Sequence, residues 1–373
     1  MLKKLLIFLP LGTLAAVGFL AWQRVQSNPD GVIPLPYTLP AVGEKIAVDA
    51  PLLIVGDRMA ARFGLFKETL SLDISTGLSK PLKTGVLAGE RNGLHRTLRV
   101  LENLEKWPKI MIYTGGSEEL VEEKFLTREI PTIRRNFERY ADDRWRTLLM
   151  LWSDSARLLY DPLVRQVLPD QVSVEAAREM SEAEHQVRLE LSYRIFEIEL
   201  ERMVELSRTQ DVVLIFMTVP VNLDIPPKKT CTVAVTNEAT REMAAIRELI
   251  RQQDYKAAYP RARELAENTI ANAEVFFLYG QVAQRIGRGD EAKGALRKAA
   301  AFDCRSWRAN EVTNSIIRKV ARDHRVALFD FADLVDDDWR QNTTFFDEIY
   351  PQDLYYEKAS KALSVVLRRM LKL

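Results

Sequence analysis

The chain has 373 residues, 47% hydrophobic and 28% charged, and its 53 Lys and Arg against 52 Asp and Glu leave a net charge of +1. This balance argues against a whole-chain nucleic-acid binder, and the ordinary content of Gly and Pro argues against collagen-like or wholly disordered chains. Three His and two Cys are too few for a zinc ribbon or a His-rich site, so we expect no metal and no cofactor.

The first 24 residues have the pattern of a membrane anchor. Lys3 and Lys4 precede a run from Leu5 to Trp22 that carries no charge, and a helix of that length spans roughly 27 Å, enough for a thin bilayer. The lysines orient the N-terminus to the cytoplasm, which places the bulk of the chain on the periplasmic side of an inner membrane. A cleaved signal peptide is the alternative, but the apolar residues up to Trp22 favour an uncleaved, single-pass anchor.

Apolar runs and helical patterns predict an α/β sandwich beyond a Pro-rich linker at residues 25–49. The runs lack polar alternation, which is typical of a parallel sheet covered on both faces. They predict a three-layer α/β/α, flavodoxin-like domain in two parts, residues 50–230 and 305–373. The predicted strands are Pro51–Gly56, Pro81–Ala88, Lys109–Tyr113, Asp211–Thr218 and Arg325–Asp330, with helices between them at Gly93–Leu104 and Asn310–Arg322.

Two helical segments exceed what this sandwich needs. Residues 117–208 are rich in Arg and Glu, which favours a salt-bridged helical layer over a partner-binding surface, with aromatic side chains at Trp145, Trp152 and Tyr160. Residues 231–304 form an insert whose core resembles tetratricopeptide repeats, because Asp254 and Arg288 begin similar stretches 34 residues apart. Two repeats are too few to stand alone, so we expect the insert to pack against the sandwich, with peptide binding as a secondary role.

The two cysteines, Cys231 and Cys304, flank this insert. In an exported protein they form either a disulfide that joins the two ends of the insert or a pair of buried thiols. A bridge would stabilise the chain by roughly 4 kcal/mol in the chain-entropy description.

Short motifs follow the predicted strands in a consistent order. Gly56-Asp57-Arg58 ends the first strand and opens a helix, and it resembles the Gly-Asp-Ser elbow of the SGNH (GDSL) hydrolase superfamily. Three further motifs stand where that family has its oxyanion glycine, its Gly-x-Asn-Asp block and its Asp-x-x-His-Pro block: Gly89, Tyr113–Glu119 and Phe346–Pro351. The resemblance covers residues 50–230 and 304–373 and implies an SGNH-type α/β fold.

The catalytic positions of the family are degenerate in this chain. Arg58 stands in place of the nucleophilic Ser, Tyr350 in place of the general-base His, and Ser117 in place of the block-three Asn, while Gly89 and the orienting acid Asp347 remain. Arg does not lose its proton at working pH, and Tyr, with an unperturbed pKa near 10, is a poor base at pH 7. We therefore expect no ester hydrolysis by the family mechanism, which needs a hydroxyl activated by an imidazole.

Arg58 has two interpretations that do not exclude each other. It is expected to form an ion pair with the orphaned Asp347, since a buried carboxylate without a partner is costly. Alternatively it opens an anion-binding site at a helix N-terminus together with Gly89, Arg62 and Arg91.

The sequence therefore predicts a membrane-anchored pseudoenzyme that binds a protein partner in a cell-envelope assembly, or an anionic or glycan ligand, and no nucleic acid. The alternative is an active SGNH-type esterase or O-acyl-transfer enzyme acting on envelope glycans or lipids. That alternative requires a rebuilt site, for which Ser117 and His95 are the candidate pair. The remaining histidines, His185 and His324, are expected to be structural.

Overall fold

The computed structural model describes residues 48–75, 82–89, 92–119, 124–125, 130–131, 133–134, 182–228, 236–303, 308–336, 338–339 and 344–370. Nearly all of these residues belong to one compact unit, which comprises residues 42–122 and 179–373 and holds both the sheet and the helical insert. Several predictions fall outside the described residues: the anchor, the linker, the side chains of Trp145, Trp152, Tyr160 and His185, and both cysteines. Within the described ranges, no helix is long and apolar enough to cross a membrane.

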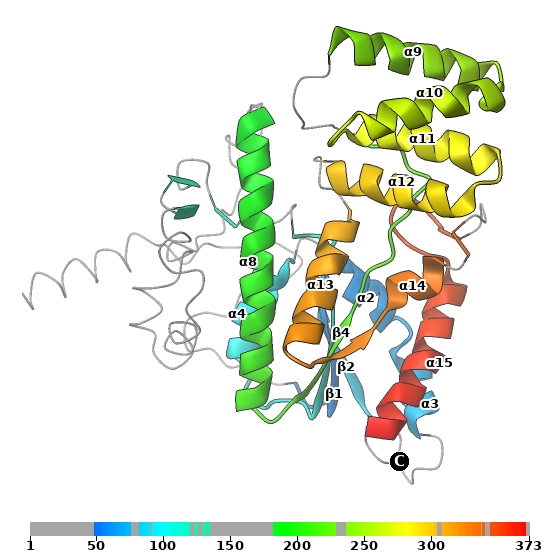
Figure 1. Cartoon of the computed structure of the whole chain (residues 1–373). Coiled ribbons are helices and arrows are strands. Elements are labelled where there is room, and N and C mark those ends of the chain that lie inside the picture. The colour runs from blue at the N-terminus through cyan, green and yellow to red at the C-terminus, as the bar shows by residue number, and fades with distance from the viewer. Residues whose placement is uncertain are drawn as a thin grey trace, which may run out of the picture. The chain divides into compact units, whose positions relative to one another are not determined.

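Five parallel strands form a single sheet in the order β2-β1-β3-β4-β5 (Figure 1). This is the doubly wound, flavodoxin-like order. The sheet grows from β1 to β2 on one side and from β3 to β5 on the other, so the topological switch point lies between β1 and β3. Every strand lies within one residue of a predicted apolar run, which confirms the parallel α/β class. The strands are β1 Leu52–Gly56, β2 Thr84–Ala88, β3 Ile110–Thr114, β4 Val213–Met217 and β5 Ala327–Phe329.

Alternate residues of each strand enter two separate cores. Leu53 and Val55 of β1 belong to the core under α4 (Leu94–Glu102), α8 (Glu182–Thr209) and α13 (Glu311–Asp323). Leu52 and Ile54 belong to the other core, under α2 (Arg58–Gly64), α3 (Lys67–Ser75), α14 (Phe331–Asp336) and α15 (Asp353–Met370). Since both faces are covered, the central strands β1, β3 and β4 are apolar at nearly every position.

The insert consists of four helices, α9 (Asn237–Arg251), α10 (Tyr255–Glu267), α11 (Ala273–Arg285) and α12 (Gly289–Phe302), which follow β4 and lead into α13. Consecutive helices pack against each other (Figure 1). The contact between α11 and α12 is tight at Gly280, where an added Cβ would lie 2.6 Å from Cγ of Leu296. The 34-residue spacing corresponds to the starts of α10 and α12 at residues 255 and 289.

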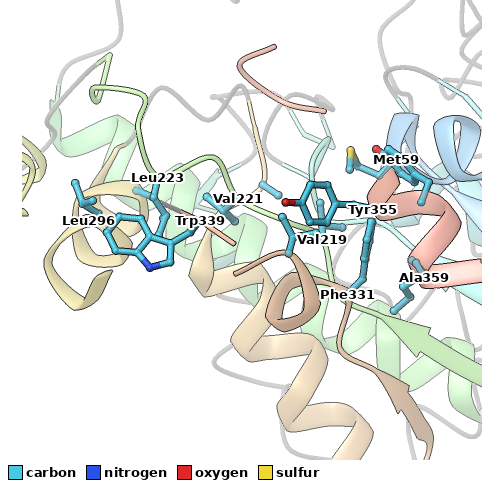
Figure 2. Packing of buried hydrophobic residues seen from close by; sticks show 14 of the residues in the cluster. Met59, Val219, Val221, Leu223, Leu296, Phe331, Trp339, Tyr355 and Ala359 are labelled. Carbon is cyan, nitrogen blue, oxygen red and sulfur yellow. The ribbon is translucent and has the colours of Figure 1, made fainter. Parts of the chain in front are cut away.

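The insert packs onto the sandwich through a continuous apolar cluster, as predicted. Figure 2 shows Trp339 beside Leu296 of α12 and Leu223, and the cluster continues through Val219 to Phe331 of α14. Each fully buried large side chain of this kind stabilises the fold by roughly 1.5–3 kcal/mol. The cluster therefore joins the insert and the α2/α15 face of the sheet into one core.

Candidate functional site

The carboxyl end of β1 approaches the carboxyl end of β3 very closely at Gly56. This residue has a φ of +142°, and an added Cβ would lie 2.0 Å from the carbonyl oxygen of Thr114. Only glycine fits such a backbone and such a contact. The approach brings the loop after β1 against the loop after β3, at the place where ligands bind in doubly wound folds.

Asp57 joins these two loops with one buried carboxylate. It is the N-cap of α2, and its Oδ1 accepts a hydrogen bond from Met59 N (2.8 Å). Its Oδ2 accepts from Ser117 N (2.7 Å), Ser117 Oγ (2.6 Å) and Glu118 N (3.2 Å). Burial raises the pKa of Asp57 above its usual range, although these donors and the charge of Arg58 act in the opposite direction. The carboxylate therefore fixes both loops.

Arg58 forms an ion pair with Glu118 at 2.5 Å, with side-chain exposures of 15% and 3%. This corrects the expected pairing with Asp347. Oδ1 of Asp347 instead accepts from the backbone N–H groups of Ile349 and Tyr350, both at 2.7 Å, so this carboxylate shapes its own loop. The sequence has two carboxylates after β3, Glu118 and Glu119, but no pattern in it showed which carboxylate Arg58 would reach.

The other candidate anion-site residues are Arg62, Gly89 and Arg91, of which the structure describes the first two. Arg62 lies one turn further along α2 and pairs with Asp353 at the start of α15 (2.5 Å). Gly89 is buried after β2, and Arg91 lies outside the described residues. Tyr350 belongs to a tight loop in which Phe346 N donates to the Tyr350 carbonyl (2.8 Å).

The candidate serine and histidine engage different carboxylates. The Ser117 hydroxyl donates to Asp57, whereas His95 Nδ1 lies 2.5 Å from Oε1 of Glu199, with both side chains buried. The pair that a rebuilt hydrolase site requires is therefore not formed. Glu199 is 104 residues from His95 in sequence, and no local pattern indicated the contact. Nε2 of His324 lies 3.5 Å from Oε1 of Glu201.

A narrow cavity of about 190 Å³ lies beside Ser117, but it has no room for a water-sized sphere. Asn222 and Arg308 also line it. Arg308 donates to the backbone carbonyls of Asn222 and Ile225, the latter at 3.2 Å. Burial lowers the pKa of Arg308 to about 10, while the charges of Asp303 and Glu348 oppose this shift. Sequence reasoning missed Arg308, which serves here as a clamp on the loop after β4.

A second polar cluster lies at the same edge of the sheet, after β4 and β5. Asp330 accepts hydrogen bonds from Arg318 Nε (2.7 Å) and Thr218 Oγ1 (2.7 Å). Burial alone would raise the pKa of Asp330, but these hydrogen bonds and the charge of Arg318 bring it below its usual range. The cluster holds α13 against the ends of both strands.

Fold and site define a parallel, doubly wound α/β protein in which the Arg58–Glu118 ion pair joins the loops after β1 and β3. No family model and no curated protein matches the sequence. A search of solved structures found a protein of Bacteroides fragilis described as a "putative acylhydrolase", with 8% identity, coverage of 93% of this chain and 94% of that one, and a TM-score of 0.34.

Proposed function

We propose that this protein is a non-catalytic binding or scaffolding member of the SGNH-like class, held in an inner membrane with its bulk in the periplasm. Its role would be to bind a partner protein within a cell-envelope assembly. The N-terminal apolar run supports the location, and the retained α/β fold supports the class.

The observation that carries the proposal is the pairing of Arg58 with Glu118 at the position where SGNH enzymes have their nucleophile. A guanidinium cannot attack an acyl group, and breaking a buried ion pair to free the position leaves an uncompensated charge. Among the described residues of the loops after β1 and β3, Ser117 is the only serine, and its hydroxyl donates a hydrogen bond to the Asp57 carboxylate. This bond further supports the loss of acyl transfer.

Binding of an anionic or glycan ligand at Arg58 belongs to the same proposal. Such a ligand would replace Glu118 as the partner of the guanidinium, at the N-terminus of α2, with Gly89, Arg62 and Arg91 as the other candidate contacts. An active esterase or O-acyl-transfer enzyme is the alternative function, and it requires a different nucleophile from the one that the family uses.

Turnover of short acyl esters by the full chain in detergent tests the proposal, together with labelling by a fluorophosphonate serine-hydrolase probe. A known serine esterase is the positive control, and Arg263→Ala serves as the matched control for Arg58→Ala because Arg263 is an exposed arginine of α10 paired with Glu267. We expect no turnover and no labelling in the parent or in either variant. Turnover in the parent that disappears in Ser117→Ala would establish the alternative.

A further inference from the structure

A groove of about 350 Å³, open to solvent on one side, lies between α9, α11 and the chain segment that leads from β4 into the insert. Its floor is apolar: Phe277 and Leu278 are nearly buried, and Ile250 is half-buried. Pro226 and Pro227 form one wall. The groove is therefore built jointly by the insert and by the loop after β4, and its volume lies within the range of ligand-binding pockets.

The proline wall is held in place from both sides. Arg308 donates to the carbonyls of Asn222 and Ile225, directly before the two prolines. Directly after them, Lys228 N donates to Oδ2 of Asp303 (3.1 Å). A wall fixed before binding lowers the entropy lost when a ligand is bound. The segment is thus a preformed surface of the groove.

The polar residues of the rim favour a carboxylate. Arg247 and Arg251 lie one turn apart on α9, and Glu274 is the single acidic residue of the lining. Both arginines already form exposed ion pairs, with Glu274 and Glu248. Exposed pairs contribute little, so a ligand carboxylate competes for the arginines at small cost. The Gln281 side chain makes no hydrogen bond within the described part of the chain, and its amide presents both a donor and an acceptor.

We infer that this groove binds a short extended peptide of a partner protein, with one apolar side chain on the Phe277 and Leu278 floor and an adjacent carboxylate at Arg247 and Arg251. A groove open along one side fits a segment of a longer chain better than an enclosed small molecule, and Gln281 is placed to bind a peptide group. The carboxylate belongs either to an acidic side chain or to the C-terminus of the partner. The inference rests on the proposed binding role and assigns that role a surface away from Arg58.

Fluorescence anisotropy with labelled peptides tests the inference on the full chain in detergent. The probes are Gly-Ser octapeptides with Leu-Asp, Leu-Asn, Leu-Lys or Ser-Asp at the centre, and two peptides that end in Leu with a free or an amidated C-terminus. We expect Leu-Asp to bind about fivefold more tightly than Leu-Asn, as one exposed charge pair allows, and roughly tenfold more tightly than Ser-Asp. Preference for the free C-terminal Leu over its amide would assign the carboxylate to a chain end.

Two variants connect the binding to the groove. Arg251→Gln should bind the Leu-Asp and Leu-Asn peptides equally well. Ile250→Ser should show a smaller difference in affinity between the Leu-Asp and Ser-Asp peptides than the parent. Arg263→Gln on α10, an exposed arginine that does not line the groove, should change neither. Circular dichroism melts establish that each variant is folded.

Equal dissociation constants for all probes, no binding up to about 1 mM, or unchanged selectivity in folded Arg251→Gln would overturn the inference. Ester turnover by the parent would refute the proposed function while leaving the peptide selectivity intact, so the two failures are distinguishable.

Discussion

The buried carboxylate of Asp57 should contribute much more to stability than an ordinary helix N-cap. Replacement by Ala removes the cap of α2, which costs about 1 kcal/mol. It also leaves the buried N–H groups of Ser117 and Glu118 without their acceptor, at about 1–3 kcal/mol each. We therefore expect Asp57→Ala to lower the free energy of unfolding by about 3–7 kcal/mol.

Asp254→Ala is the matched control, because Asp254 also caps a helix, α10, but is exposed, and within the described residues its side chain accepts only from Ala257 N (3.1 Å). It should cost about 1 kcal/mol. Thermal melts and urea unfolding followed by tryptophan fluorescence give both values, and the Asp57 variant should melt roughly 10 °C below the parent. Equal losses in the two variants would refute the argument that Asp57 holds the loops after β1 and β3 together.

Three further predictions concern close contacts and charge. Gly56→Ala should abolish soluble, folded protein because its Cβ would overlap a backbone carbonyl of β3. Gly294→Ala is the control: nothing lies within 4 Å of the added Cβ, so this variant should fold and its free energy of unfolding should rise by up to about 1 kcal/mol. Comparable expression of the two variants would contradict the prediction. Gly280→Ala should separate α11 from α12 and lower the melting temperature of the chain, and an unchanged melt would show that the two helices have room. Asp330→Asn should be less stable than the parent above about pH 5, and the difference in unfolding free energy should shrink below about pH 4. The reason is that a carboxyl with a lowered pKa loses its stabilising effect as it is protonated. A difference that is constant with pH would show that the ion pair with Arg318 contributes nothing.

The strands were predictable because a parallel strand buried on both faces is marked by its own residues. Leu52–Val55 and Ile110–Tyr113 are apolar without interruption, and in a chain this polar such short runs are typical of strands that are covered on both sides. The helical pattern of the insert was predictable for a similar reason, since the 34-residue spacing between Asp254 and Arg288 is a local feature. Sheet order then placed the loops after β1 and β3 side by side.

The partners at the site were not predictable, because they depend on side-chain reach between segments far apart in the chain. Arg58 had two carboxylates within the expected cleft, and the backbone turn at Asp347 uses one of them internally. Burial of Arg308 depends on the carbonyls of a loop more than 80 residues away. Neither periodicity nor motif spacing contains that information.

The hydrogen bond between Lys228 N and Asp303 has a consequence for how this architecture can vary. The chain leaves the α/β fold and returns to it at one point, although the two residues are 75 positions apart in sequence. The residues between them form one closed loop in the topological sense, and the entropic cost of closing a loop grows only with the logarithm of its length. Helix pairs can therefore be added to or removed from the α9 side of the insert without changing the strand order, whereas α12 must stay because its Leu296 belongs to the core that the insert shares with the sheet.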